Sequence, residues 1–444
     1  MNIKFKNKTH LFAALFVGIL LLLSLALSGT YALWTITEEQ TGSNKIVGGC
    51  LNFEMKDSSE AITLENVFPI DDFSGTRLQG YSFTVTNKCS KPMDYRIELD
   101  SLYEEDAEFM NNLYIATLLD YGVKSKLSEL ELLENTDLNV REKHTLAYDT
   151  VLGNATNSHV LRIWVDESAP NDEQNKTFLS KVNIVGGQEI EKYYTPTECF
   201  AFNYSMDMII NYYPDCGGTD VVIPYQFYDK NNDRVINEFQ IAIASFENKG
   251  LTSLEIPRSV TEIQPNSINK NPNLTKIVFK DGLSKIGSQA FENTETKGNL
   301  SFVMFPKTLT KIDSYAFENN SLEHVIIPDN ILNLETYAFQ NNNLKDVMVG
   351  KGLTVLQNYS FAYNKLENVI LPDDGNLTTI GQRAFMNNNI KRLVLPYSVT
   401  KINAYAFSNN PGMNLIIKRP DSTGMTLETF WNTSVKVTYD PNAI

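Results

Sequence analysis

Apolar residues recur with a period near 22 along the second half of the chain. The recurring residues are Phe246, Ile268, Phe291, Phe317, Phe339, Phe361, Phe385, Phe407 and Phe430, and the successive gaps are 22, 23, 26, 22, 22, 24, 22 and 23 residues. A period in this range is typical of a solenoid, in which each repeat buries its apolar face only against its neighbours. Solenoids mostly present extended surfaces to partners, so this period favours a binding protein.

Within each repeat, aliphatic and polar residues alternate over a short segment that usually ends in proline. In LEHVIIP (322–328) the first, fourth and sixth residues are expected to face the core, with a strand between. Proline has no N–H, so it suits the end of such a strand. A second short strand supplies a further core residue such as Ile312, and an Ala-Phe pair then directs a ring inward. Asn runs such as QNNN (340–343) are expected to form turns, because Asn tolerates left-handed backbone.

These features resemble the BspA-like (treponemal-type) leucine-rich repeat, whose unit is close to L-x-x-L-x-I-P-x-x-V-T-x-I-G-x-x-A-F. The resemblance spans about residues 199–430, with eight or nine copies. Two departures are visible: Ile268 replaces a phenylalanine, and the repeat around 291–300 carries a longer loop, ENTETKGN. The resemblance implies surface exposure and adhesion to host proteins, other cells or matrix, and it implies no catalysis.

One column of residues on the expected sheet is a candidate partner-binding face. In leucine-rich arrays the strands stack into a parallel, concave sheet, and the residue between the last two core positions points outward. Down the array this column reads Glu255, Val278, Met304, Ile326, Met348, Ile370 and Val394. Its apolar members would form a stripe about 24 Å long at ~4.8 Å per strand. The neighbouring, mostly polar column reads Ser253, Lys276, Phe302, His324, Asp346, Asn368 and Arg392, of which we include Phe302, His324 and Arg392 in the candidate face.

Two interpretations of the apolar column remain open. An exposed apolar stripe with a polar border is typical of a partner site, here centred on Met304, Ile326, Met348 and Ile370. Alternatively, these side chains only stabilise their same-face neighbours in the sheet, and nothing binds there. Replacing Ile326 and Met348 with lysine separates the two, because a true site would lose its partner while the fold keeps its thermal stability.

Strand-type segments separated by turn-rich ones fill residues 33 to about 190. Examples are YSFTVTN (81–87), HVLRIWVDE (159–167) and TFLSKVNIVG (177–186). Several such strands with polar breaks predict an antiparallel β-sandwich. The expected fold class is therefore mainly β and multidomain, with an antiparallel β-sandwich followed by a leucine-rich-repeat solenoid that carries a parallel concave sheet.

The N-terminus has the pattern of an export signal. Three lysines within the first eight residues precede an apolar run from Leu11 to Leu27, and small residues lead to Ala32, where we expect a signal peptidase to cut. A retained anchor is the alternative, because the 24 residues from Leu11 to Trp34 are enough to span about 30 Å of hydrocarbon. Either way the remainder of the chain is expected to be secreted or held at the cell surface.

The start of the β-rich half resembles the camelysin/TasA family of Gram-positive surface proteins. The motifs are GTYALWT followed by NKIVGGCLNFEM, and LRIWVDESA with NKTF looks like the end of related modules, so the resemblance covers roughly residues 28–187. It implies a secreted or matrix-associated β-sandwich. Some members have been called metallopeptidases, but this chain has no HExxH motif, and the histidines of the region, His144 and His159, are isolated in sequence.

An exported chain makes its four cysteines candidates for disulfides. Cys199 and Cys216 enclose a short segment of two strand-like stretches, so we expect them to pair, and closing that loop is worth ~3 kcal/mol. Cys50 with Cys89 is then the default second pair. A reactive thiol is the alternative, although no histidine lies close in sequence to either pair.

Charge and composition argue against several function classes. The formal net charge is −15 and no basic cluster offsets it, so nucleic acid is not an expected partner. Only four histidines and four cysteines occur, and G-x-S-x-G, Walker A, G-x-G-x-x-G, C-x-x-C and H-E-x-x-H motifs are absent. We therefore expect no enzyme activity, cofactor or metal. The expected partner is a protein or another macromolecule of the cell surface or matrix, and a membrane is contacted only through an uncleaved signal segment.

The chain of 444 residues is too long for one core, and the patterns above divide it. The expected parts are a signal peptide or anchor (1–32), a camelysin/TasA-like β-sandwich (33–188), a linker (189–198), an N-terminal cap with the first repeat (199–250), leucine-rich repeats (251–412) and a C-terminal cap (413–444). We predict an exported adhesion protein. The alternatives are a biofilm or matrix fibre component assembled through the sandwich and, less favoured, a secreted peptidase.

Overall fold

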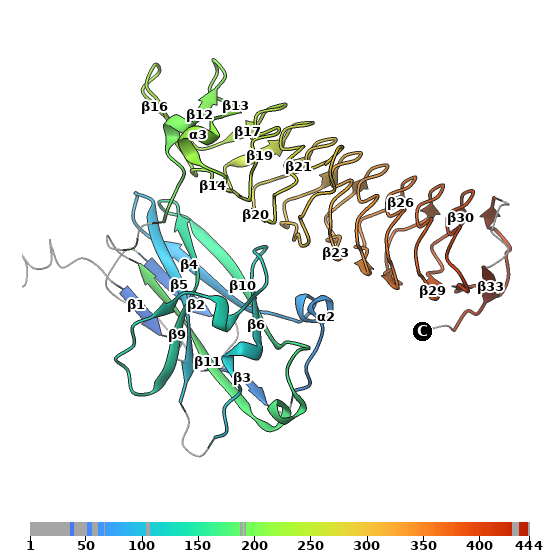
Figure 1. Cartoon of the computed structure of the whole chain (residues 1–444), viewed down its shortest axis with the longest axis horizontal. Coiled ribbons are helices and arrows are strands. Elements are labelled where there is room, and N and C mark those ends of the chain that lie inside the picture. Colours follow the sequence, from blue (N-terminus) through green and yellow to red (C-terminus); the bar gives the residue numbers. More distant parts are fainter. Residues whose placement is uncertain are drawn as a thin grey trace, which may run out of the picture. The chain divides into compact units, whose positions relative to one another are not determined.

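The computed structural model describes residues 36–39, 51–55, 61–65, 67–103, 107–186, 190, 192–428 and 435–442 (Figure 1). The chain divides into two compact units, and each is considered by itself. The first comprises Met1–Leu119 and Ser125–Lys192, and the second comprises Asp120–Lys124 and Tyr193–Ile444. The predicted signal segment, its cleavage site at Ala32 and Cys50 lie outside the described residues.

The first unit consists of two antiparallel sheets. One has the order β1 (Ile36–Glu39), β11 (Thr177–Gly186), β5 (Met93–Leu102), β9 (Val140–Val151) and β8 (Leu132–Leu133), with β3 (Ile62–Glu65) also on β11. The other has the order β2 (Leu51–Met55), β4 (Tyr81–Asn87), β10 (Thr156–Val165), β6 (Ile115–Leu119) and β7 (Ser125–Lys126). Short helices complete the unit: α2 (Asp72–Thr76), η1 (Asn112–Tyr114), η2 (Leu127–Glu129) and η3 (Asn171–Asn175).

Both sheets contribute to a single apolar core. Along β10, Asn157, His159, Leu161 and Ile163 are buried, and the residues between them are more exposed. This alternation is the period-two pattern of a strand with one face on a core. Phe83 of β4, Ile97 of β5 and Val182 of β11 are fully buried members of the same cluster. The prediction of antiparallel strands in this half is confirmed.

The second unit is a parallel β-solenoid whose strands form two rows. Figure 1 shows the two rows along opposite edges of the solenoid. The first row contains β14 (Asp220–Val222), β18 (Ser253–Ile256), β20 (Lys276–Phe279), β23 (His324–Ile326), β25 (Asp346–Met348), β27 (Asn368–Ile370), β29 (Arg392–Leu395), β31 (Asn414–Ile417) and β33 (Lys436–Tyr439). The second row contains β13 (Met208–Tyr212), β17 (Phe239–Ile241), β19 (Val260–Ile263), β21 (Lys285–Ile286), β22 (Lys311–Ile312), β24 (Asn333–Leu334), β26 (Val355–Leu356), β28 (Thr379–Ile380), β30 (Lys401–Ile402) and β32 (Thr426–Leu427). The predicted parallel solenoid is confirmed.

The solenoid begins with a small cap. It contains η4 (Thr197–Cys199), β12 (Phe200–Phe202), which pairs antiparallel with β13, the helix α3 (Pro214–Gly217), and a hairpin of β15 (Phe227–Asp229) and β16 (Arg234–Ile236). The predicted disulfide between Cys199 and Cys216 is present, with a Cα–Cα distance of 5.4 Å. The predicted pair of Cys50 with Cys89 stays a prediction, because Cys50 is outside the described residues.

The recurring phenylalanines form a continuous stack inside the solenoid. Phe317 and Phe339 lie 5.4 Å apart between ring centroids and are nearly parallel at 3°, and Phe339 and Phe361 lie 5.6 Å apart at 2°. The stack extends from Phe291 to Phe407 with similar spacing. Ile268 occupies the same position with 1% exposure, so an aliphatic side chain fills the place of a ring in that repeat. Phe430 is outside the described residues.

Asparagines at the third position after most of these core residues tie neighbouring repeats together. Asn342 Nδ2 donates to the carbonyl of Phe317 at 2.9 Å, and its Oδ1 accepts from the amide of Leu322 at 3.1 Å. The same donation is made by Asn271, Asn320, Asn364, Asn388 and Asn410. The preceding residue is often left-handed, as at Asn341 with φ of 57°. The Asn runs are therefore structural turns that satisfy buried main-chain groups.

One predicted strand is not formed. Residues 301–306, in the repeat LSFVMFP, have no strand assignment, and no ladder joins them to β20 or β23. This segment follows the longer loop, and only isolated main-chain bonds link it to the next repeat, such as Glu323 N to Ser301 O at 3.0 Å. The first row of strands is consequently divided here. Among the described residues, no helix is long and apolar enough to span a membrane.

Candidate partner-binding face

The centre of the predicted apolar column lies on three adjacent parallel strands. Ile326 of β23 pairs with Met348 of β25, which pairs with Ile370 of β27. The residues before them point the other way, and Val325 and Val347 are 1% and 0% exposed in the core. Because side chains alternate across a strand, Ile326, Met348 and Ile370 face outward, and all three are half-buried. We call these three residues the apolar triplet.

The outer members of the column are placed on other strands of the first row. Val278 of β20 pairs with Glu255 of β18, and both are half-buried. Val394 of β29 is half-buried and pairs with Ile416 of β31. Met304 differs, because it lies outside any strand and is only 9% exposed. The accessible part of the column is therefore centred on the apolar triplet and does not include Met304.

The C-terminal end of the column was not predicted from the sequence. Ile416 is 9% exposed and pairs in turn with Thr438 of β33. In the preceding repeat Ile390 lies three residues before Leu393, but in this one Met413 takes the first core position only two residues before Leu415. Because this spacing is shorter, the repeat pattern did not place Ile416 in the same column as Val394. The aliphatic run in NLII (414–417) was the sequence feature that could have predicted this strand.

Polar residues beside the apolar triplet are bonded to one another across the strands. His324 Nδ1 lies 2.7 Å from Asp346 Oδ2, and Asn368 Nδ2 donates to Asp346 Oδ1 at 2.6 Å. Burial opposes ionisation of Asp346, but the hydrogen bonds from His324 and Asn368 outweigh it and lower the pKa of that carboxyl. Of the other two predicted residues in this column, Arg392 is exposed and Phe302 is half-buried.

The polar column places hydrogen-bonding and charged groups beside the apolar triplet. A His–Asp pair activates a nucleophile only when a hydroxyl or thiol lies within reach of the imidazole. The residue paired with Asp346 on the next strand is Asn368, which is not a nucleophile. The column instead supplies hydrogen-bond donors, a carboxylate and an exposed guanidinium beside the apolar triplet.

The histidines of the first unit are buried and bonded. His159 Nε2 lies 2.6 Å from the Tyr95 hydroxyl, and His144 Nε2 lies 3.0 Å from Glu142 Oε2. Both side chains are at most 3% exposed. Among the described residues, no group of three or more His, Cys, Asp or Glu side chains is placed to hold a metal ion.

Residues 239–298 and 294–414 match the family described as BspA type Leucine rich repeat region, in six copies. The match falls on the repeats identified from the sequence and confirms their type. No curated protein matches the chain at a significant level. The resemblance of the first unit to the camelysin/TasA family stays a prediction.

Solved structures similar to the chain include three leucine-rich repeat proteins. A leucine-rich repeat protein from Bacteroides ovatus is 18% identical, with 57% of this chain and 79% of that chain covered and a TM-score of 0.35. The T. pallidum leucine-rich repeat protein is 24% identical, with 44% and 88% covered and a TM-score of 0.37. A leucine-rich cell surface protein from Faecalibacterium prausnitzii is 16% identical, with 56% and 95% covered and a TM-score of 0.21.

Proposed function

We propose that this chain is an exported, non-enzymatic binding protein whose solenoid holds a protein partner at the cell surface or in the matrix. The observation that carries the proposal is the apolar triplet, Ile326, Met348 and Ile370, which lies in register on three parallel strands and faces outward. Aliphatic side chains gathered in this way on an open surface are typical of interaction sites. BspA-type repeats along residues 239–414 support the same class of function.

The chemistry of the face suits a protein partner. Protein interfaces combine an apolar centre with a polar rim that fixes orientation, and the bonded column of His324, Asp346 and Asn368 forms such a rim along one side of the apolar triplet. Methionine adapts its shape to a partner more easily than branched side chains do, so Met348 suits the middle of the contact. Arg392, exposed at the end of the column, adds a donor for carboxylates.

Location and partner class rest on the sequence. The basic and apolar pattern of residues 1–32 predicts export, and the net charge of −15 disfavours nucleic acid. Adhesion is then the role that an extended, open array performs best, because its surface is long and its pockets are few.

The test replaces Ile326 and Met348 with lysine in the full chain. Both side chains are half-buried and outward, so the new ammonium groups can extend to water and the melting temperature should change little. The measured quantity is the amount of purified protein retained on whole cells and on extracted matrix. We expect I326K/M348K to lose retention, because charge placed at the centre of an apolar contact is costly to desolvate.

A matched control comes from the second row of strands. Val355 of β26 and Thr379 of β28 are also half-buried, outward and in register with each other. The V355K/T379K variant should bind as the unmodified chain does. Retention of I326K/M348K at the unmodified level, or a collapse of its melting temperature, contradicts the proposed face.

A further inference from the structure

One repeat of the solenoid carries four extra residues. Phe291 and Phe317 are separated by 26 residues, whereas 22 separate most neighbouring rings. The extra length lies in the segment Glu292–Asn299, which we call the long loop. Main-chain bonds anchor it at both ends, from Asn293 N to Glu318 O at 3.3 Å and from Gly298 N to Asn319 O at 2.9 Å. Lys297 Nζ also donates to the carbonyl of Asn342 at 3.3 Å, so the loop is held in one place.

The long loop interrupts the asparagine ladder. The third residue after the ring is Thr294 here, where six other repeats have asparagine. Asn293 turns inward in its place, with 4% exposure, and its Nδ2 donates to Asn320 Oδ1 at 2.9 Å. Gly298 makes room for this amide, because a Cβ at that position would lie 2.3 Å from Asn293 Nδ2.

The inward amide leaves one acceptor unsatisfied. Asn293 Oδ1 is buried and has no hydrogen-bond partner anywhere in the described part of the chain. Buried acceptors nearly always have a donor, and one without a partner is costly, so the inward amide is a local cost of the long loop. The ladder asparagines, such as Asn342, have both ends of the amide bonded and show no such need.

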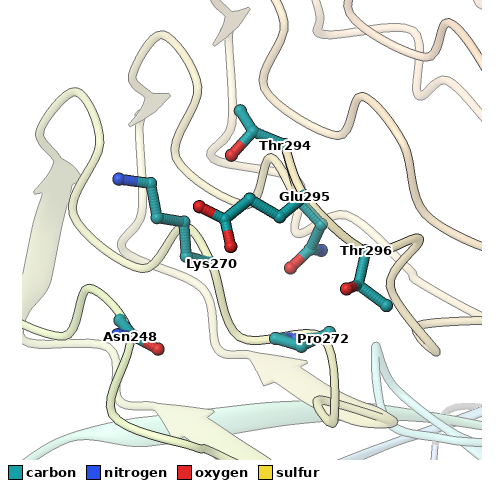
Figure 2. A pocket seen from close by; sticks show the side chains of 7 residues that line it. Asn248, Lys270, Pro272, Thr294, Glu295 and Thr296 are labelled. Atoms are coloured by element: carbon teal, nitrogen blue, oxygen red, sulfur yellow. The ribbon is translucent and has the colours of Figure 1, made fainter.

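Asn293 lines an open cavity at the long loop, and Figure 2 labels the other lining residues. The cavity has a volume of about 230 Å³, far above the roughly 10–15 Å³ that one water requires. Its other lining residues come from the two preceding repeats and from the loop itself: Asn248, Lys270, Pro272, Thr294, Glu295 and Thr296. The cavity is therefore large enough for an organic molecule.

The lining groups select the charge of the ligand. Glu295 disfavours an anion, and the ammonium of Lys270, paired with Glu247 at 2.7 Å, disfavours a bare metal cation. The amides and hydroxyls of Asn248, Thr294 and Thr296 each donate and accept. A neutral molecule with several hydroxyl groups matches this mixture, because each of its hydroxyls also donates and accepts. The ring of Pro272 adds an apolar patch for the C–H face of a sugar.

We propose that this cavity binds one ring of a neutral saccharide, with sugar hydroxyls bonded to Glu295 and to the loop threonines Thr294 and Thr296. The site lies on different repeats from the apolar triplet, so it is a second binding function of the solenoid. A surface protein with both sites attaches to glycan through one and to protein through the other.

The experiment is saturation-transfer difference NMR on the full chain. The probes are the methyl glycosides of glucose, galactose, mannose and N-acetylglucosamine, each at tens of millimolar, with glucuronic acid and calcium chloride as charged competitors. We expect transfer to at least one neutral glycoside and no displacement of it by either competitor. The E295A/T296V variant should lose that transfer while its melting temperature stays unchanged, because both side chains are exposed.

A second variant removes the cavity while restoring a regular repeat. Deleting residues 294–297 and making Gly298→Asn gives the sequence FENNNL, which matches FQNNNL at 339–344 and returns the ring spacing to 22. This shortened chain should fold, keep the asparagine ladder and bind no glycoside. The I326K/M348K variant should keep full transfer, which separates this site from the partner-binding face.

Three results overturn the proposal. They are the absence of transfer to every neutral glycoside, equal transfer in E295A/T296V or in a folded shortened-loop variant, and displacement of the glycoside by calcium or glucuronic acid. If the shortened-loop variant does not fold, E295A/T296V decides alone, since its changes are confined to exposed side chains of the loop.

Discussion

At the scale of single residues, the stacked rings are the strongest local contributors to the solenoid. Phe339 is fully buried and has a parallel neighbour on each side, with centroid distances of 5.4 Å to Phe317 and 5.6 Å to Phe361. A ring in this position loses contacts to two repeats when it is truncated, and the repeats cannot close the gap without breaking their ladders.

Phe339→Ala should lower the free energy of unfolding by about 3–5 kcal/mol, because it removes a buried ring and leaves a cavity. Urea denaturation of the variant and the unmodified chain measures the difference. Tyr363→Ala is the matched control, since that ring is 43% exposed and its loss should cost much less. An equal loss of unfolding free energy in the two variants would show that a stacked, buried ring stabilises the solenoid no more than an exposed one.

A pair of carboxyl groups makes the solenoid sensitive to pH. Burial, together with the charge of Glu292 and a hydrogen bond to it, raises the pKa of Glu318 to about 7. The folded state therefore holds this proton more tightly than the unfolded state, in which the pKa has its ordinary value of 4.5. The stabilisation is fully present below the unfolded pKa and is lost as pH rises through about 7.

Glu318→Gln tests this pH dependence, because the amide keeps the shape of the protonated acid and cannot ionise. The unfolding midpoint of the unmodified chain should fall between about pH 5 and about pH 8 by more than that of the variant. The variant should be the more stable of the two at the higher pH. Parallel pH profiles for the two proteins would exclude a shifted carboxyl at this position.

At the scale of elements, the N-terminal cap depends on its crosslink. Cys199 and Cys216 join the end of η4 to α3 across 17 residues, and Cys199 is fully buried. Capping segments close the exposed end of a solenoid core, so loosening one should fray the first repeats.

Replacing both Cys199 and Cys216 with serine should cost ~3 kcal/mol, because the unfolded chain regains the entropy of the open loop. Denaturant titration without reductant gives the difference, and hydrogen exchange should show its largest increase in β13 and β17. Unchanged stability would mean that the packing of the cap suffices without the crosslink.

Some strands of the solenoid could be predicted from the sequence, and one could not. The register of β23, β25 and β27 was predictable because each repeat places its aliphatic residues at the same offsets, and the pairing of Ile326 with Met348 follows from them. The missing strand at 301–306 was not predictable, because its residues fit the pattern and only the structure shows that they form no ladder. The spacing of aliphatic residues within a repeat predicts the strands that recur in every repeat. A strand that is missing from one repeat depends on tertiary contacts, which the spacing does not show.

Of the two candidate sites, one could be predicted from the sequence and the other could not. The apolar triplet was visible in the sequence as a column of similar residues. The cavity under the long loop was not, because it depends on the amide of Asn293 turning inward and on side chains from three repeats meeting. The length of the loop was the only sequence signal for that site, and it carries no information on ligand chemistry.

At the scale of the whole molecule, two units with different architecture share one chain. The first is built from antiparallel sheets, and the second is a parallel solenoid with BspA-type repeats. We propose that the solenoid is the binding unit, because β23, β25 and β27 leave an in-register apolar surface outside the core. The histidines of the first unit are buried and bonded within it.

Site-specific photo-crosslinking tests the central claim most directly. A benzophenone amino acid placed at Met348, the middle of the apolar triplet, should attach covalently to a protein partner when the chain is bound to cells or matrix. The same group at Val355, a half-buried outward position on the second row of strands, should give no such adduct. Adducts at Met348 alone support the proposed face. Adducts at Val355 alone, or at neither position while the protein stays bound, contradict it.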